Sequence, residues 1–287
     1  MSLLDIVVDQ ALKNRPDLTS LRTVVEKELI HHDILRIMSE NGFLDGLVFM
    51  GGTCLRLCHG SVRCSEDLDF AGGAGFDRTG MQGLSKSLSD GLTRKYGVVV
   101  SVGDPVRDSG NTDTWRIRIQ TRPDRPDIPA QRINIDICAI PAREPTPQML
   151  INPYGVDMGT SGLIIRAESR QEIFVDKLVA FAVRRGRVKQ RDIWDIGWLH
   201  RCGVSPRMDL LRLKLSDHGW NDAAFLSAYE ERLSDLGVGR AIRDFQSEMR
   251  RFLAGGDVAA LEEPGYWIWL TGLLSDYAVR ARDALRQ

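Results

Sequence analysis

The sequence lacks several features that would assign it to a familiar class. Its 287 residues contain no apolar run near the roughly 20 residues that a membrane span needs. The five cysteines are an odd count without paired Cys-x-x-Cys spacing, which argues against a disulfide framework and a zinc site. No Gly-x-Ser-x-Gly turn supports acyl chemistry. The beginning of the chain lacks a secretory signal pattern, so we expect a cytoplasmic protein that makes no use of a membrane.

The charge balance is also uninformative as a whole. A net charge of −1 gives no global attraction to nucleic acid. One stretch is nevertheless strongly basic and could neutralise phosphates locally: Arg184, Arg185, Arg187, Lys189 and Arg191. By itself, such a cluster is more often a solvated helix end.

Apolar spacing divides the chain into a mixed first half and a helical second half. Strand patterns are expected at 47–50, 67–70, 98–102, 115–120 and 132–140, and helical patterns at 3–12, 21–38, 53–58 and 81–96. The proline-rich stretch 122–129 reads as a loop between two antiparallel strands, and 141–147 ends the last strand. From residue 168 onward the patterns are helical: 172–184, 191–200, 208–215, 223–233, 241–253 and 266–285. We therefore expect an α+β protein with a mixed sheet flanked by helices (1–165), followed by an α-helical domain (166–287).

Two glycines stand between the first expected strand and the first short helix. Gly51 and Gly52 let the backbone approach a ligand closely and turn its N–H groups outward, and Thr53 adds a hydroxyl donor. A polyphosphate group is the kind of ligand that such a turn binds.

Three aspartates provide the chemistry. Asp67 and Asp69 are one residue apart on an expected strand, so their side chains project from the same face. Asp136 is flanked by isoleucines in the most apolar strand, where an acid is costly unless it is paired or metal-bound. If the two strands are neighbours, the three carboxylates form one site for two metal ions, Mg²⁺ or alternatively Mn²⁺, with Asp136 as the base or base-positioning group. One ion would activate the attacking hydroxyl and the other would hold the triphosphate. An isolated Asp-x-Asp or Gly-Gly is usually structural, whereas this ordered combination is far more specific.

At these residues the chain resembles the DNA polymerase β-like nucleotidyltransferases, and most closely the AbiEii/MenT type of nucleotidyltransferase toxin. The segments that carry the likeness are 25–29, 51–55, 65–70, Lys177 and 191–196. The resemblance implies a polymerase β-like core and gives roles to four further residues. Lys177 and Asp192 join the catalytic set, while Arg191 and Asp195 join Gly51, Gly52, Thr53 and Lys177 in holding the nucleotide. The helical domain would then complete the active-site cleft.

The residues of the helical half also allow a plainer interpretation. Lys177 and Asp192 could form a surface ion pair, and Asp195 could only brace Arg191. The pair His31 and His32 is expected on a helix surface, and Trp267, Trp269 and Tyr277 are expected in a core.

The resemblance implies a toxin of a type IV toxin–antitoxin or abortive-infection system that transfers NMP from an NTP to RNA, with the tRNA 3′ end as the acceptor and an antitoxin as a partner. Two alternatives remain open from the sequence. The same fold could modify a small molecule or a protein hydroxyl, or the chain could be mainly a binding component of a toxin–antitoxin pair.

Overall fold

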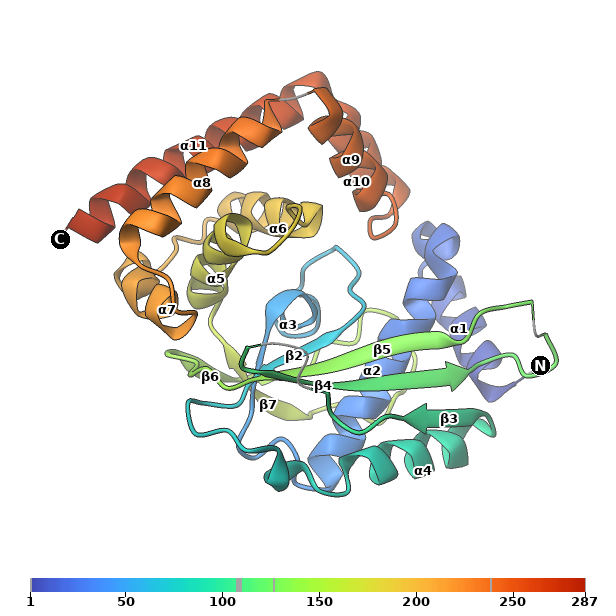
Figure 1. The fold of residues 1–287 in the computed structure, drawn as a ribbon. Coiled ribbons are helices and arrows are strands. Elements are labelled where there is room, and N and C mark those ends of the chain that lie inside the picture. Colours follow the sequence, from blue (N-terminus) through green and yellow to red (C-terminus); the bar gives the residue numbers. More distant parts are fainter. Residues whose placement is uncertain (1, 107–109, 126, 238, 287) are drawn as a thin grey trace. The chain divides into compact units, whose positions relative to one another are not determined.

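The structure is a computed structural model that describes residues 2–106, 110–125, 127–237 and 239–286 (Figure 1). The chain divides into two compact units, Met1–Glu168 and Ser169–Gln287. Pro126, in the expected proline-rich loop, lies outside the described residues. Within the described ranges, no helix combines the length and apolar character that a membrane crossing requires.

The first unit is built on a seven-stranded mixed sheet in the order β3-β4-β5-β2-β1-β7-β6 (Figure 1). Its strands are β1 Val48–Met50, β2 Leu68–Ala71, β3 Val99–Val102, β4 Thr112–Gln120, β5 Gln131–Cys138, β6 Pro145–Met149 and β7 Ile164–Glu168. β2 runs parallel to β5 and antiparallel to β1, and β4 and β5 form the expected antiparallel pair. The strands that contain the aspartates are therefore neighbours in the sheet, although β3 and β4 separate them in sequence.

Alternation along β5 fixes the two faces of this sheet. Ile133, Ile135 and Ile137 are fully buried, whereas Asn134 and Asp136 on the other face are only partly buried. The helices of the unit are α1 Leu3–Asn14, α2 Arg22–Glu40, α3 Gly51–His59 and α4 Leu84–Tyr96, with 3₁₀ turns at Pro16–Leu21 and Arg78–Met81. α2 packs against α4. The acids thus lie on the face of the sheet that the isoleucine core does not occupy.

The second unit is entirely helical in its described part. It comprises α5 Arg170–Val183, α6 Gln190–Arg201, α7 Leu211–Asp217, α8 Asp222–Leu236, α9 Gly239–Met249, α10 Gly255–Glu262 and α11 Pro264–Arg286, with a 3₁₀ turn at Met208–Leu210. α8 and α11 lie side by side, and the Tyr229 hydroxyl donates to the Leu274 carbonyl at 3.1 Å (Figure 1). Tyr277 is 1% exposed and packs on Phe174, so its expected core position is confirmed.

The expected α+β class is confirmed. The structure also contains two strands, β6 and β7, and one helix, α10, that the sequence did not predict. β6 contains Pro145 and Pro147, which predicted a loop. Because β6 is an edge strand, a missing N–H can face away from the ladder, which explains why prolines are tolerated there. β7 and α10 were not expected from the apolar pattern.

One expectation about α2 is wrong. His31 and His32 are both fully buried instead of lying on a helix surface. Burial is possible because distant parts of the chain supply partners: His31 Nε2 donates to the Glu66 carbonyl at 3.0 Å, and His32 Nδ1 lies 2.8 Å from the Thr160 hydroxyl. Periodicity identifies the most apolar side of a helix but not whether its other sides are also covered.

Candidate active site

The glycine turn lies directly beside an aspartate. Gly51 begins α3 with a φ of +76°, and a Cβ built on it would lie 2.6 Å from Asp69 Oδ2. Met50, the last residue of β1, is paired with Asp69 in the sheet. Only glycine combines this backbone conformation with such a close carboxylate. The first turn of α3 and the Asp69 carboxylate therefore form one site.

The sheet register places two of the three expected aspartates side by side. Asp69 and Asp136 are direct partners across the parallel β2–β5 ladder, so their side chains project from the same face of adjacent strands, which lie about 4.8 Å apart. Asp67 stands just before β2, and its Oδ1 accepts the Asn134 N–H at 3.1 Å. We call this part of the sheet, defined by Asp67, Asp69 and Asp136, the acid face.

Hydroxyl groups orient the acid face from two sides. Thr114 on β4 pairs with Asp136 and donates its Oγ1–H to Asp136 Oδ1 at 2.6 Å. Thr53 is fully buried; its hydroxyl donates to the Asp67 carbonyl and lies 2.7 Å from the Ser65 hydroxyl. An anion at the glycine turn would consequently meet the main-chain N–H groups of α3, while the Thr53 side chain supports the segment that leads into β2.

Thr114 and Asn134 were not singled out in the sequence. The signal for Thr114 was available, because the alternation recognised at 115–120 continues back to residue 112 and places Thr114 on the side opposite Trp115. Asn134 acts through its main-chain N–H, which no side-chain pattern reveals.

Gly52 has its own close neighbour. A Cβ at this position would lie 2.5 Å from a guanidinium nitrogen of Arg63, a side chain that is 2% exposed. Arg63 also donates to the Cys64 carbonyl at 2.9 Å. A buried positive charge thus lies directly behind the first turn of α3, where it adds to the positive end of the helix dipole.

The other expected residues are gathered in the second unit. Lys177 Nζ on α5 lies 2.7 Å from Asp192 Oδ1 and 2.8 Å from Asp195 Oδ2, both on α6. Arg184 Nη2 donates to Asp192 Oδ2 at 3.0 Å. Lys177, Asp192 and Asp195 are at most 9% exposed, so this is a buried network instead of a surface ion pair.

Two neighbouring cations act on Asp192. Burial alone would raise the pKa of Asp192, but the neighbouring charges of Lys177 and Arg184 outweigh it and hold that pKa below its usual 3.8. The Arg191 guanidinium lies 3.5 Å from Glu248 and stacks over Phe252. Asp195 pairs with Lys177 in this network.

The donor set of the acid face suits a hard divalent cation. Carboxylate oxygens from two adjacent strands are the ligands that Mg²⁺ prefers, and it commonly combines them with substrate phosphates. Three ionised carboxylates on one face repel one another unless a cation neutralises them. The carboxylates of the acid face are therefore residues that could hold a divalent cation.

Two solved structures share this architecture. The nucleotidyltransferase toxin MenT4 of Mycobacterium tuberculosis aligns with a TM-score of 0.54 and 18% identity over 99% of this chain and 98% of its own. JHP933 of Helicobacter pylori aligns with a TM-score of 0.50 and 17% identity over 91% and 94%. At these identities the likeness defines the fold. No curated protein matched the sequence.

A family model resolves the identity further. The model described as "Nucleotidyl transferase AbiEii toxin, Type IV TA system" matches residues 33–269, which is most of the chain. The protein belongs to the AbiEii family and is a nucleotidyltransferase toxin of a type IV toxin–antitoxin system. Membership implies an NTP substrate and an antitoxin partner.

Proposed function

We propose that this toxin transfers NMP from an NTP to an RNA acceptor, the 3′ end of tRNA, in a Mg²⁺-dependent reaction in the cytoplasm. The observation that carries the proposal is the direct pairing of Asp69 with Asp136, with Asp67 fixed beside them by Asn134. In this proposal all three carboxylates hold Mg²⁺, with Mn²⁺ as a substitute. When bound, the cation neutralises phosphate charge and makes the acceptor hydroxyl easier to deprotonate.

The chain's own residues perform the remaining tasks. Main-chain N–H groups at Gly52 and Thr53 receive the polyphosphate, and the buried Arg63 adds positive charge behind them. The acceptor hydroxyl oxygen displaces pyrophosphate from the α-phosphorus, and its proton passes to Asp136, whose orientation the Thr114 hydroxyl fixes.

In the second unit, the ion-pair network holds the ammonium group of Lys177 in a defined position. We propose that Lys177 binds a phosphate of the NTP and that Asp192 and Asp195 hold its ammonium in place, with Arg191 close by in the sequence. Because Lys177 already pairs with two buried acids, its position is defined before substrate arrives, which lowers the entropy cost of using it.

The basic loop between α5 and α6, residues 184–189, supports an RNA acceptor. Its exposed cations are Arg185, Arg187 and Lys189. Arg232 on α8 donates to the main-chain carbonyls of Arg184 and Gly186 at 2.8 and 2.7 Å, which anchors the loop. Three solvent-exposed cations on an anchored loop suit contact with a phosphate backbone.

The test is to incubate the purified toxin with tRNA, Mg²⁺ and each of the four labelled NTPs, beside the variant Asp69→Asn. We expect label in the RNA with the wild type only, and loss of that label when EDTA is added. No incorporation into RNA with any NTP rejects the RNA acceptor. Label that appears instead in protein or in a small alcohol assigns the enzyme to the alternative acceptor class.

A further inference from the structure

Helix α2 contacts the residues that precede β2 and the residue that begins β5, the two strands of the acid face. It does so from behind the sheet: the Gln131 side chain that it binds lies on the same face as the buried Ile133 and Ile135, opposite the acid face. None of the α2 residues below belongs to the proposed catalytic set.

The first group of contacts holds the two residues that immediately precede Asp67. Glu28 Oε1 accepts the Ser65 N–H at 2.7 Å. Lys27 Nζ pairs with Glu66 Oε1 at 2.9 Å, and His31 Nε2 donates to the Glu66 carbonyl at 3.0 Å. Three side chains of one helix thus fix both the main chain and the side chain of this short segment.

Glu28 is the centre of this group. It is 0% exposed, and its second oxygen accepts hydrogen bonds from Arg56 Nε at 3.1 Å and from the Tyr154 hydroxyl. Arg56 in turn donates to the Ser61 carbonyl at 2.8 Å. A buried carboxylate with this many donors is held in one orientation, since losing any partner would leave a desolvated charge.

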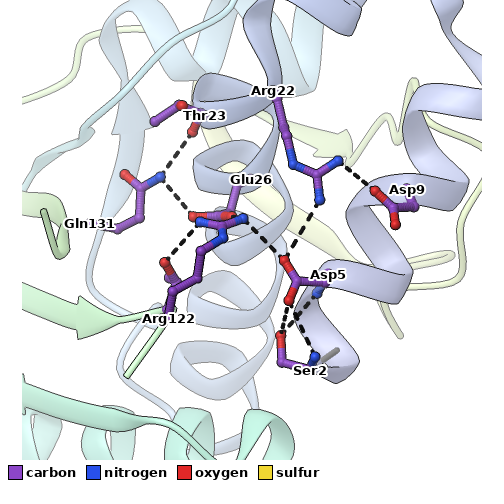
Figure 2. A network of polar contacts seen from close by, with 9 residues as sticks. Ser2, Asp5, Asp9, Arg22, Thr23, Glu26, Arg122 and Gln131 are labelled. Atoms are coloured by element: carbon purple, nitrogen blue, oxygen red, sulfur yellow. Dashed lines mark hydrogen bonds and ion pairs between the residues drawn. The ribbon is translucent and has the colours of Figure 1, made fainter. Parts of the chain in front are cut away.

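The second group of contacts holds the β4–β5 hairpin (Figure 2). Glu26 is 1% exposed, and it accepts from Gln131 Nε2 at 2.8 Å and pairs with Arg122 at 2.9 Å. Gln131 begins β5, the strand of Asp136, and Arg122 follows β4. Arg122 also pairs with Asp5 of α1 at 3.0 Å, which ties this arrangement to a second helix.

These contacts oppose a specific force. Without a cation the ionised carboxylates of the acid face repel one another, and the short β2 offers few ladder hydrogen bonds to resist displacement. Groups that bind a metal must be held within about 0.5 Å of their working geometry by surrounding side chains.

We propose that α2 is the positioning element of the metal site, through Lys27 and Glu28 toward β2 and through Glu26 toward β5. The inference rests on the proposed function, in that it takes the acid face as the metal site. These residues act through the aspartates and touch neither metal nor substrate.

A charge swap tests the proposal with Mn²⁺ as the probe. The proteins are the full-length wild type, Lys27→Glu, Glu66→Lys, the double variant and the matched control Glu40→Lys. Glu40 ends the same helix, is exposed, and pairs with Arg36 at 2.9 Å. Mn²⁺ affinity is measured by electron paramagnetic resonance, and melting temperatures report folding. Lys27→Met replaces Lys27→Glu if the latter does not fold.

The direction of the Lys27→Glu effect separates positioning from simple electrostatics. Added negative charge near a cation site should tighten Mn²⁺ binding, whereas loss of positioning should weaken it. We expect about 10-fold weaker binding and a lower kcat with a nearly unchanged KM for NTP, the size seen when residues supporting metal ligands are removed. The double variant should regain most of the affinity, and Glu40→Lys should equal the wild type.

Unchanged or tighter Mn²⁺ binding by Lys27→Glu overturns the proposal, as does a double variant no better than the single ones. The proposed metal site is tested separately by Asp69→Asn. If the wild type and Asp69→Asn bind Mn²⁺ equally, the acid face is not the metal site. If Asp69→Asn loses binding while Lys27→Glu keeps it, only the positioning role of α2 is lost.

Discussion

Replacement of Gly51 by alanine should remove activity far out of proportion to its effect on folding. The new Cβ would lie 2.6 Å from Asp69 Oδ2, and ordinary contact begins at 3.4 Å, so the carboxylate must withdraw by about 0.8 Å. A displacement of about 1 Å at a catalytic group can cost about 100-fold in rate. The same substitution also strains the backbone, since φ is +76° there, at a cost of about 1–3 kcal/mol.

Gly73→Ala is the matched control. Gly73 has a φ of +82°, and a Cβ built on it meets nothing within 4 Å. Both variants therefore carry the backbone strain, and only one displaces a carboxylate. About 1 kcal/mol corresponds to about 2–4 °C in a domain of this size, so both melting temperatures should fall by several degrees.

Nucleotide incorporation is assayed at a temperature below the melting temperature of either variant, and thermal unfolding is measured separately. We expect Gly51→Ala to lose about 100-fold in activity and Gly73→Ala to stay within a few-fold of the wild type. Equal activities for the two variants would refute the reasoning, because the contact between the glycine turn and Asp69 would then have no functional consequence.

Three further predictions follow from other parts of the structure. Thr114→Val should lower kcat about 10-fold by releasing Asp136 Oδ1, while Thr114→Ser keeps the hydrogen bond; equal rates for both variants contradict this role. Burial lowers the pKa of His32 from 6.5 to about 4, so the unfolded chain takes up this proton at a higher pH than the folded one. Stability should therefore be lost as pH falls from 6.5 toward 4, by up to about 3 kcal/mol, and urea unfolding of His32→Gln should show a smaller loss. Neutralising the three exposed cations of the basic loop should weaken tRNA binding and reduce its salt dependence while KM for NTP stays constant; an unchanged salt slope in filter binding argues against RNA contact there.

The acid face could be predicted from the sequence because its pattern is local. Alternation along residues 132–140 placed Asp136 opposite the isoleucines, and the spacing of Asp67 and Asp69 placed both on one side. The prediction of this site required β2 and β5 to be adjacent, and they are neighbours in the sheet. No local pattern specifies strand order, since it depends on which hydrogen bonds distant segments make.

The buried polar residues of α2 illustrate what sequence reasoning misses. Glu26 and Glu28 look like solvated helix positions, because their partners at Gln131 and Ser65 are far away in the chain. A buried carboxylate is tolerated only when donors are arranged around it, and that arrangement exists only after folding. Edge strand β6 was missed for a related reason, since proline is tolerated there because of its place in the sheet.

The central claim is that one divalent cation site is formed by aspartates from two adjacent strands. A crystal soaked with Mn²⁺ and a non-hydrolysable NTP tests it most directly, through the anomalous signal of the metal. We predict a peak bounded by carboxylate oxygens of Asp67, Asp69 and Asp136, with the triphosphate at the first turn of α3. A metal bound elsewhere, or a triphosphate remote from Gly51 and Gly52, would contradict the account.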